Sequence, residues 1–463
     1  MKSYVILDPQ HVYGVRLVEA LRRDFGLAPV CVYSDSRAEL RLRAQFPALR
    51  GAAAAGHYYL DQGSLDDLAA EIGSRHRVVA VVPYSEQAIV PGLELMRRLG
   101  LQWNAPATLA RFRDKAALKA HIAARDPTLA LGLATLVRTA EEVGGQPLPP
   151  RFVIKPVDGF GNANIGFFDR ATCRVADIAA YLASRPGGRF ILEEFFAGPE
   201  YAVNGQMDHL GEPHIIDVSR YERAADNGRP NLYHRTHHVR RQEPAFAPLV
   251  AYAARVMRAT GLVRCPFHME VILADEGPRL VEVGARLGGT HYALMSQDVH
   301  GGRLDVFALA AHYYASAQDY GTPAFDWDFY DRIHYLHLDG ICRTPGRIAK
   351  VDGVQGVEAM PEFRGWVVKP RLGAALQRTV DLYTVPYSFH LASMTSHADL
   401  FAASEAAKSM IRINEGVQRW QRLGARGRQV SMAVGSRAHY FAERQLRRCR
   451  RRLSRLKASA AFL

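Results

Sequence analysis

The sequence is poor in cysteine and lacks the spacings that would tie cysteines to a disulfide framework or a zinc site. Its five cysteines are odd in number and scattered over 463 residues, so we expect reduced thiols. No run of about 18 apolar residues that could cross a membrane is present. The N-terminal segment turns acidic too early for a secretory signal. These absences predict a cytoplasmic protein.

The sequence also lacks an excess of basic residues distributed along its length. The net charge is +13, but residues 401–463 carry 15 Lys and Arg against 3 Asp and Glu, which accounts for all but one of these charges. The rest of the chain is nearly neutral, whereas a nucleic-acid-binding domain shows a basic stripe on its folded surface. Nucleic acid is therefore disfavoured as a partner.

The N-terminal part of the sequence, residues 1–105, predicts an α/β lobe. Short apolar runs alternate with amphipathic stretches, a pattern typical of parallel βαβ units. The apolar runs are residues 4–7, 30–33 and 78–83, and the expected helices are residues 15–25, 65–72 and 84–99. The glycine fingerprint of dinucleotide sites is missing, so the lobe is Rossmann-like without such a site.

Two further domains are expected, over residues 106–320 and 321–415. The first contains apolar strands, amphipathic helices and a glycine-rich stretch: helix 107–124, strand 152–156, glycine-rich residues 158–166, helix 175–183, strand 190–196 and helix 304–317. A polar, turn-rich stretch at 318–326 marks the boundary. The second is a small α+β domain with short strands at 333–338, 367–368 and 380–384 and a helix at 400–413.

Residues 416–463 form a basic tail whose apolar residues lie mostly three or four apart. This spacing predicts a basic amphipathic helix. Three interpretations stay open: a helix that is solvated or packed on a partner, attraction to an anionic membrane surface or protein, and contact with nucleic acid.

The most informative stretch is a predicted hairpin with two acidic residues. Apolar runs 267–273 and 279–283 flank a polar turn that contains glycine. If residues 274–278 form the loop, Glu270 faces Glu282 across the ladder. Opposed like charges repel, but a divalent cation can bridge them, and oxygen ligands suit Mg²⁺ or Mn²⁺. The pair therefore predicts a metal site.

A cation and two glycines follow this hairpin directly. Arg286 supplies a fixed positive charge, and Gly288 and Gly289 allow the backbone to approach an anion closely. Together with a metal site, these residues indicate phosphoryl transfer.

Four features, in this order, resemble the ATP-grasp superfamily. They are Arg113 to Lys115 on a helix, Lys155 before the glycine-rich loop, the acidic segment 193–200, and Glu270 with Glu282 before Arg286. Residues 84–86 and 99–104 resemble the lobe that precedes the ATP-grasp domain and its junction. The segment 281–289 is especially similar to L-amino acid ligases, which join a carboxylate to an amine. The resemblance covers residues 1–320 in layout and residues 343–413 more loosely.

The resemblance implies an ATP-grasp fold, with α/β and α+β domains: a Rossmann-like lobe, two α+β subdomains that sandwich ATP, a small C-terminal α+β domain and the basic helical tail. It places Lys115 and Lys155 on the α- and β-phosphates and the loop with Gly161 over the triphosphate. The segment from Glu193 resembles the adenine hinge. There, the Glu194 carbonyl and the Phe196 amide would pair with adenine, and Glu200 would accept the ribose hydroxyls.

The resemblance also gives the metal and catalytic residues. Glu270 and Glu282 would hold two Mg²⁺ ions, although many relatives have Asn where this chain has Gly284. Arg286, with Gly288 and Gly289, would bind the transferred phosphate and the oxyanion. His291 follows closely and is a candidate to approach the acyl carbon.

Substrate contacts are expected from a long loop at residues 219–238 over the cleft. Its candidates for carboxylate contacts are Arg220, Arg223, Tyr233, His234 and Arg235. His268 shares the strand face of Glu270, so it either orients substrate or is a structural histidine.

The expected function is an ATP-dependent carboxylate–amine ligase that forms an acyl phosphate and then an amide. The expected cofactors are ATP and Mg²⁺ or Mn²⁺. The expected partners are a small-molecule carboxylate, in particular an amino acid, and an amine. A homodimer is left open. The alternatives are an ATP-grasp carboxylase or purine-pathway ligase acting through carboxyphosphate or formyl phosphate, and a nucleotide-binding protein without ligation.

Overall fold

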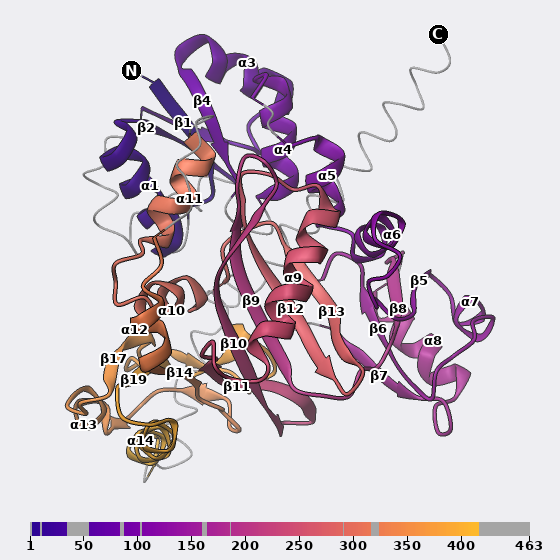
Figure 1. The fold of residues 1–463 in the computed structure, drawn as a ribbon, viewed down its shortest axis with the longest axis vertical. Helices are drawn as coiled ribbons and strands as arrows, with labels where there is room; N and C mark the ends of the chain where they lie inside the picture. The colour runs from indigo at the N-terminus through magenta and orange to yellow at the C-terminus, as the bar shows by residue number, and fades with distance from the viewer. Residues whose placement is uncertain are drawn as a thin grey trace.

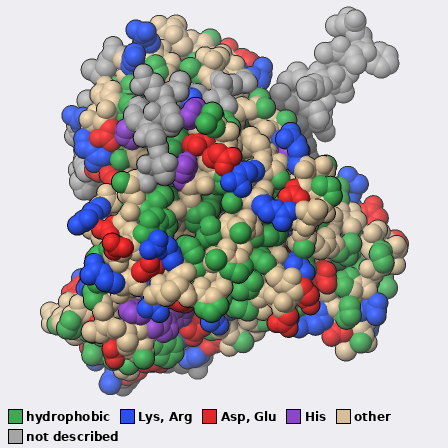
Figure 2. Space-filling model, viewed as in Figure 1, with side chains coloured by type: hydrophobic (Ala, Val, Ile, Leu, Met, Phe, Trp, Pro, Cys, Tyr) green, Lys and Arg blue, Asp and Glu red, His purple; other side chains and the backbone are tan. Residues whose placement is uncertain are grey.

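The computed structural model describes residues 2–9, 12–34, 55–83, 88–101, 104–159, 164–185, 187–289, 291–315 and 324–415. Several predictions therefore lie wholly or partly outside the described residues: the loop position of Gly161, residues 84–86, most of the boundary at 318–326, and the basic tail 416–463. Within the described part of the chain, no helix has the length and apolar character needed to cross a bilayer. Lys and Arg are interspersed with Asp and Glu on the face shown in Figure 2.

The first lobe contains a four-stranded parallel sheet, as the alternating pattern predicted. Its strand order is β3 (Gly56–Tyr59), β2 (Ala28–Tyr33), β1 (Lys2–Leu7) and β4 (Arg77–Val82), with helices α1 (Val12–Phe25), α3 (Leu65–Arg75) and α4 (Ile89–Arg98). Strand β3 was not predicted. Helix α11 (Val306–Ala315) returns from far along the chain and packs on α1 (Figure 1).

The helix predicted at 107–124 is two helices, α5 (Pro106–Arg111) and α6 (Lys115–Arg125). The single-helix prediction is wrong because Asp114 leaves the helical conformation and its side chain accepts a hydrogen bond from the Ala117 amide, which starts a new helix. Arg113 therefore lies in the turn between the helices. Lys115 is the first residue of α6.

The second sheet is antiparallel and carries the nucleotide candidates Lys155 and Glu193. Its order is β5 (Ala134–Val137), β8 (Phe190–Glu194), β6 (Arg151–Pro156) and β7 (Gly166–Asp169), with helices α7 (Ala140–Gly144) and α8 (Val175–Ala183). Helix α8 has the predicted bounds.

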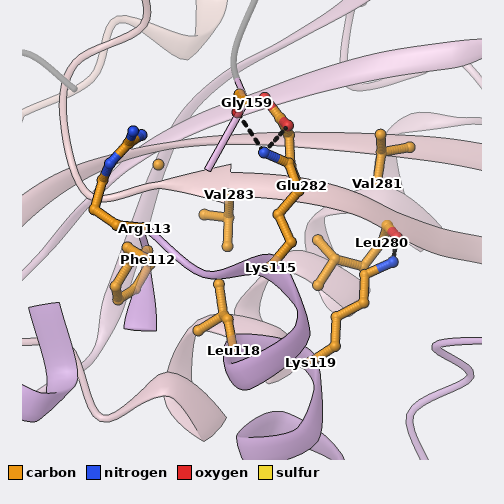
Figure 3. Close-up of a pocket in the computed structure, with 11 residues that line it drawn as sticks. Phe112, Arg113, Lys115, Leu118, Lys119, Gly159, Leu280, Val281, Glu282 and Val283 are labelled. Atoms are coloured by element: carbon orange, nitrogen blue, oxygen red, sulfur yellow. Dashed lines mark hydrogen bonds and ion pairs between the residues drawn. The ribbon is translucent and has the colours of Figure 1, made fainter. Parts of the chain in front are cut away.

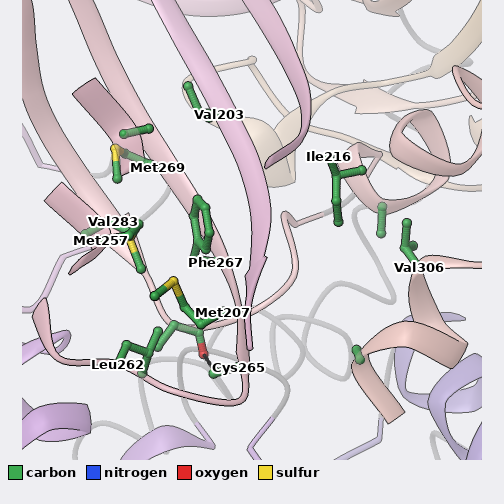
Figure 4. Close-up of a cluster of buried hydrophobic side chains, with 14 of the residues drawn as sticks. Val203, Met207, Ile216, Met257, Leu262, Cys265, Phe267, Met269, Val283 and Val306 are labelled. Atoms are coloured by element: carbon green, nitrogen blue, oxygen red, sulfur yellow. Dashed lines mark hydrogen bonds between the residues drawn. The ribbon is translucent and has the colours of Figure 1, made fainter. Parts of the chain in front are cut away.

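The third sheet has eight strands and dominates the molecule. Its order is β13 (Gly277–Gly284), β12 (Cys265–Ala274), β9 (Glu200–Met207), β10 (Pro213–Asp226), β11 (Arg229–His238), β14 (His334–Asp339), β19 (Ser388–Ser393) and β17 (Phe363–Val368). Helix α9 (Phe246–Thr260) packs on β9, β10, β12 and β13. Val203, Met269 and Val283 belong to the same buried cluster as Met257 of α9 (Figure 4). Residues of the opposite parity, including Glu270, therefore face away from α9.

The long loop predicted at 219–238 is wrong: this segment forms most of the β10–β11 hairpin. Asn227 and Gly228 both have positive φ, +53° and +75°, and Asp226 pairs with Arg229. An Asn-Gly turn with two positive φ values suits the twist of a two-residue hairpin. This dipeptide was the sequence signal for the hairpin.

The C-terminal region adds strands to the large sheet and also contains two small two-stranded sheets. Strands β14, β19 and β17 continue the ladder from β11, whereas the strand predicted at 380–384 is a 3₁₀ turn over Leu382–Thr384. Asp381 caps that turn. The remaining elements here are α10 (Tyr292–Asp298), α12 (Trp327–Arg332), β15 (Gly346–Arg347), β16 (Val351–Asp352), α13 (Val354–Glu358), β18 (Ala375–Leu376), α14 (His397–Met410) and β20 (Arg412–Ile413).

Candidate functional site

Glu270 and Glu282 lie directly opposite each other in the β12–β13 ladder, which confirms the predicted register. The predicted five-residue loop is wrong. Ala274 pairs with Gly277, so the turn is shorter, and a bulge at Val281 restores the opposition because Val271 pairs with Leu280. Both carboxylates therefore project from the same face of the sheet.

Lys115 connects helix α6 to this acidic pair. Its Nζ lies 3.0 Å from Glu282 Oε2 and donates to the Gly159 carbonyl at 2.5 Å (Figure 3). The surrounding cavity has a volume of about 20 Å³ and lies against β13. It is lined by Phe112, Arg113, Lys115, Leu118, Lys119, Gly159 and residues 280–284. The helix start and the hairpin thus meet at one site.

Lys155 reaches the same strand from the second sheet. It donates to the Val281 carbonyl at 3.2 Å and lies 2.6 Å from Glu193 Oε2. Burial lowers the pKa of Lys155, but the nearby carboxylates Glu193 and Glu282 outweigh it and the pKa is raised. The ammonium is therefore charged.

Sequence reasoning missed Lys119, which lies one helical turn after Lys115. Its Nζ is 2.5 Å from Glu193 Oε1 and donates to the Leu280 carbonyl at 2.7 Å. Burial lowers its pKa, and Glu193 partly offsets this. The pKa of Glu193 is lowered because the two lysines outweigh its burial. The spacing of the two lysines on α6 was the signal that could have found it.

The hinge candidates Glu194 and Phe196 follow directly after this buried carboxylate. Glu194 ends β8 with an exposed side chain, and the Phe196 ring lies 5.9 Å from the Arg279 guanidinium. Gly132 packs so closely on Phe196 that an added Cβ would lie 2.3 Å from the ring. The adenine contacts of the two hinge residues stay a prediction.

Glu200 is bound by Arg223, whose guanidinium donates to both carboxylate oxygens at 2.7 and 2.9 Å. Burial, together with Glu270, raises the pKa of Glu200 despite this partner. The Arg223 guanidinium also stacks on the rings of Tyr221 and Tyr233 at 4.3 and 3.6 Å. The predicted ribose contact of Glu200 would share its oxygens with Arg223.

Glu270 is held in its charged form on the same face. Tyr221 donates to Glu270 Oε1 at 3.0 Å, and His268 Nε2 lies 3.8 Å away. Burial raises the pKa of Glu270, but His268, Arg223 and Tyr221 outweigh it and lower the pKa to about 2. A charged, buried carboxylate opposite a second carboxylate suits a divalent cation.

No cluster of three His, Cys, Asp or Glu side chains in the described part of the chain could hold a metal by itself. A cation held by Glu270 and Glu282 would therefore complete its shell with phosphate oxygens or water. Mg²⁺ characteristically binds in this way, through one or two carboxylates plus substrate phosphates. The donor set fits metal-bound nucleotide.

The segment after the hairpin packs closely against the sheet. Arg286 is half-buried and donates to the Leu287 carbonyl at 2.9 Å. A Cβ on Gly288 would lie 2.5 Å from the Cβ of Tyr292 and 3.0 Å from the Asn204 side chain. Only glycine fits there, whereas Gly289 has open space around its Cα. The roles of Arg286 and Gly289 stay predictions.

The two site histidines differ in their surroundings. His268 Nδ1 lies 2.7 Å from Asn204 Oδ1, on the face of Glu270. His291 is fully buried, and its ring stacks on His337 with centroids 3.6 Å apart. Burial lowers the pKa of His291 well below its usual value. It is therefore a neutral imidazole.

Three predicted substrate contacts do not converge on Glu270. Arg220 pairs with Tyr201, on the sheet face opposite Glu270, and is exposed. His234 Nδ1 lies 3.3 Å from the Asp339 carbonyl, and Arg235 pairs with Glu222. Among the predicted contacts from this hairpin, the structure brings Arg223 and Tyr233 to the site. The reason is that a hairpin, unlike a loop, sends alternate side chains to opposite faces.

The architecture is the ATP-grasp fold, and residues 148–293 match the family model of the ATP-grasp domain. The structure is similar to the L-amino acid ligase from Bacillus licheniformis, with a TM-score of 0.71 and 17% identity, over 89% of this chain and 98% of that one. It is also similar to phosphoribosylglycinamide synthetase from Anaerococcus prevotii, with a TM-score of 0.62 and 12% identity, over 89% and 99% of the two chains.

A curated relative is dapdiamide A synthase from Enterobacter agglomerans. It is 26% identical over 216 residues, which are 44% of this chain and 50% of the relative. The chain thus spans half the length of this relative. The recognition of an ATP-grasp domain that resembles amino acid ligases is confirmed.

Proposed function

We propose that the protein is an ATP-dependent ligase that joins a carboxylate to an amine, and that the carboxylate is that of an amino acid. The observation that carries this proposal is the convergence on one hairpin, β12–β13, of an opposed carboxylate pair and the ammonium of Lys115. The similarity to an L-amino acid ligase and to dapdiamide A synthase supports it.

Lys115 and Lys155 bind the triphosphate, and Glu270 and Glu282 hold Mg²⁺ against it. When bound, the metal ion neutralises negative charge on the phosphates and favours attack on the terminal phosphorus. In the structure, Lys115 neutralises Glu282 and Lys155 neutralises Glu193. Both lysines exchange part of these contacts for phosphate oxygens when nucleotide enters.

The substrate carboxylate attacks the γ-phosphorus, which gives an acyl phosphate and ADP. Arg286 and the backbone at Gly289 bind the transferred phosphate, because a planar guanidinium and unhindered amides match phosphate oxygens. An amine then displaces phosphate to form the amide. Water must be excluded until the amine arrives, since it would hydrolyse the acyl phosphate.

Phosphate release with pairs of amino acids, followed by mass spectrometry of the product, tests this proposal. The ligase should release phosphate only when a carboxylate and ATP are present, and should form an amide when an amine is added. Release with bicarbonate or formate as the acid would instead indicate a carboxylase or a purine-pathway type of ligase. Binding of ATP without release under any of these conditions would contradict ligation.

A further inference from the structure

A buried polar group lies where β14 joins β11, and the chemistry above does not use it. Asp339, at the end of β14, is 2% exposed. Its Oδ1 pairs with His337 Nε2 at 3.0 Å, whereas its Oδ2 has no hydrogen-bond partner among the described residues. An unpaired buried carboxylate oxygen is costly, so it calls for an explanation.

A chain of rings connects this carboxylate to the Glu270 face. His337 stacks on His291, whose ring centroid is 4.1 Å from that of Tyr292. Tyr292 lies 4.7 Å from His268, the neighbour of Glu270. Ring contacts thus link Asp339, through His337, to the neighbour of Glu270.

The groups that face Asp339 leave it without a dedicated cation. Burial raises the pKa of Asp339 to about 6, and His291, His234 of β11 and Arg223 of β10 only partly offset it. Arg223 is already bound to Glu200 by two hydrogen bonds. Burial lowers the pKa of His337 to about 3, and burial also lowers that of His390 on β19. At neutral pH the position is an anion among neutral imidazoles, and a cationic group fits it.

We propose that Asp339 binds the ammonium group of the amine substrate and accepts its proton before that amine attacks. The inference rests on the proposed ligase function. His337 is a positioning residue, since its hydrogen bond occupies Oδ1 and leaves Oδ2 as the acceptor for the ammonium. The ligand class is a primary ammonium ion.

The proton balance of the second half-reaction is satisfied by this arrangement. The ammonium loses one proton to Asp339 Oδ2, and the neutral nitrogen then forms the C–N bond with the acyl carbon. The bond between that carbon and the phosphate oxygen breaks. The nitrogen loses its second proton to the leaving phosphate, which gives amide and hydrogen phosphate. Asp339 returns its proton to solvent after product release.

A comparison of two nucleophiles, hydroxylamine and an amino acid amine, distinguishes a role of Asp339 in binding and deprotonating the amine from a structural role. Hydroxylamine is mostly neutral at pH 8 and traps acyl phosphates as hydroxamates, so it needs neither an ammonium site nor a base. Amino acid amines need both. With a panel of the proteinogenic amino acids as carboxylate and amine, Asp339→Asn should lower amide formation by about 100-fold. Hydroxamate formation should stay within about threefold, because it bypasses the proton transfer of general base catalysis.

Asp217→Asn is the matched control. Asp217 is also fully buried, and burial raises its pKa to about 6, but both its oxygens are bound, by Asn204 and Ser296. It should change amide and hydroxamate formation by the same factor. Conversely, the inference on Asp339 is overturned if Asp339→Asn changes the two reactions equally, including a shared loss. If the unaltered protein forms no carboxylate-dependent hydroxamate, the ligase proposal itself fails.

Discussion

Lys119 and Lys155 are bound to opposite oxygens of one buried carboxylate, that of Glu193. Both also donate to carbonyls of the edge strand β13, at Leu280 and Val281. One carboxylate therefore fixes the helix α6, the second sheet and the large sheet in a common arrangement. The site depends on this buried ion triad as well as on the residues that would touch nucleotide.

The two lysines provide a matched pair of variants. Lys119→Met and Lys155→Met should each lower the free energy of unfolding by about 3–5 kcal/mol, because each leaves a buried charge with one partner fewer. Only Lys155→Met should also remove a phosphate contact. Denaturant unfolding and calorimetric titration of ATP measure the two effects. Equal losses of ATP affinity in the two variants would contradict the assignment of Lys155 to the phosphates.

Arg223 should stabilise the fold as the counterion of the buried Glu200 carboxylate. Arg223→Met removes two hydrogen bonds and the counterion of a buried carboxylate, so it should destabilise the fold by about 3–5 kcal/mol. The double variant Arg223→Met with Glu200→Gln removes the uncompensated charge and should recover part of this loss. Thermal unfolding measures both. A double variant no more stable than the single one would show that stacking on Tyr221 and Tyr233 dominates.

Glu222 should give a pH-dependent contribution to stability. Hydrogen bonding from His237, with the charge of Arg235, lowers the pKa of Glu222 to about 2 from 4.5. A lowered folded-state pKa means that the contribution is present above pH 4.5 and is lost as the pH falls towards 2. Because the side chain is 38% exposed, solvent screening limits it to about 1 kcal/mol or less.

Glu222→Gln measures this contribution. The difference in Tm between Glu222→Gln and the unaltered protein should be largest at pH 6–7 and should shrink near pH 3, within the window set by the two pKa values. A difference that is constant across this range would indicate packing and not charge as its origin.

Local sequence patterns predicted much of the fold and the acidic pair. Helix α8 and the parallel strands of the first lobe follow from hydrophobic periodicity. The opposition of Glu270 and Glu282 was predicted through a longer turn than exists, and the bulge at Val281 compensates. A bulge depends on packing against neighbouring strands, so alternation alone could not reveal it.

Most differences between the predictions and the structure concern contacts that the local sequence pattern was not used to predict. The placement of Arg220 away from the site follows from the β10–β11 hairpin, whose signal was the dipeptide Asn227-Gly228. The role of Lys119 depends on Glu193, which is distant in sequence. The pairing of Asp339 with His337 becomes meaningful only once β14 is known to extend the large sheet.

Calorimetric titration of ATP with Mg²⁺ tests the central claim most directly. The unaltered protein should bind ATP more tightly with Mg²⁺ than with EDTA. Glu282→Gln, which keeps the side-chain shape beside Lys115, should weaken the Mg²⁺-dependent part by about tenfold or more. If the unaltered protein takes up no ATP with Mg²⁺, or if Glu282→Gln leaves the Mg²⁺ dependence unchanged, the account is contradicted.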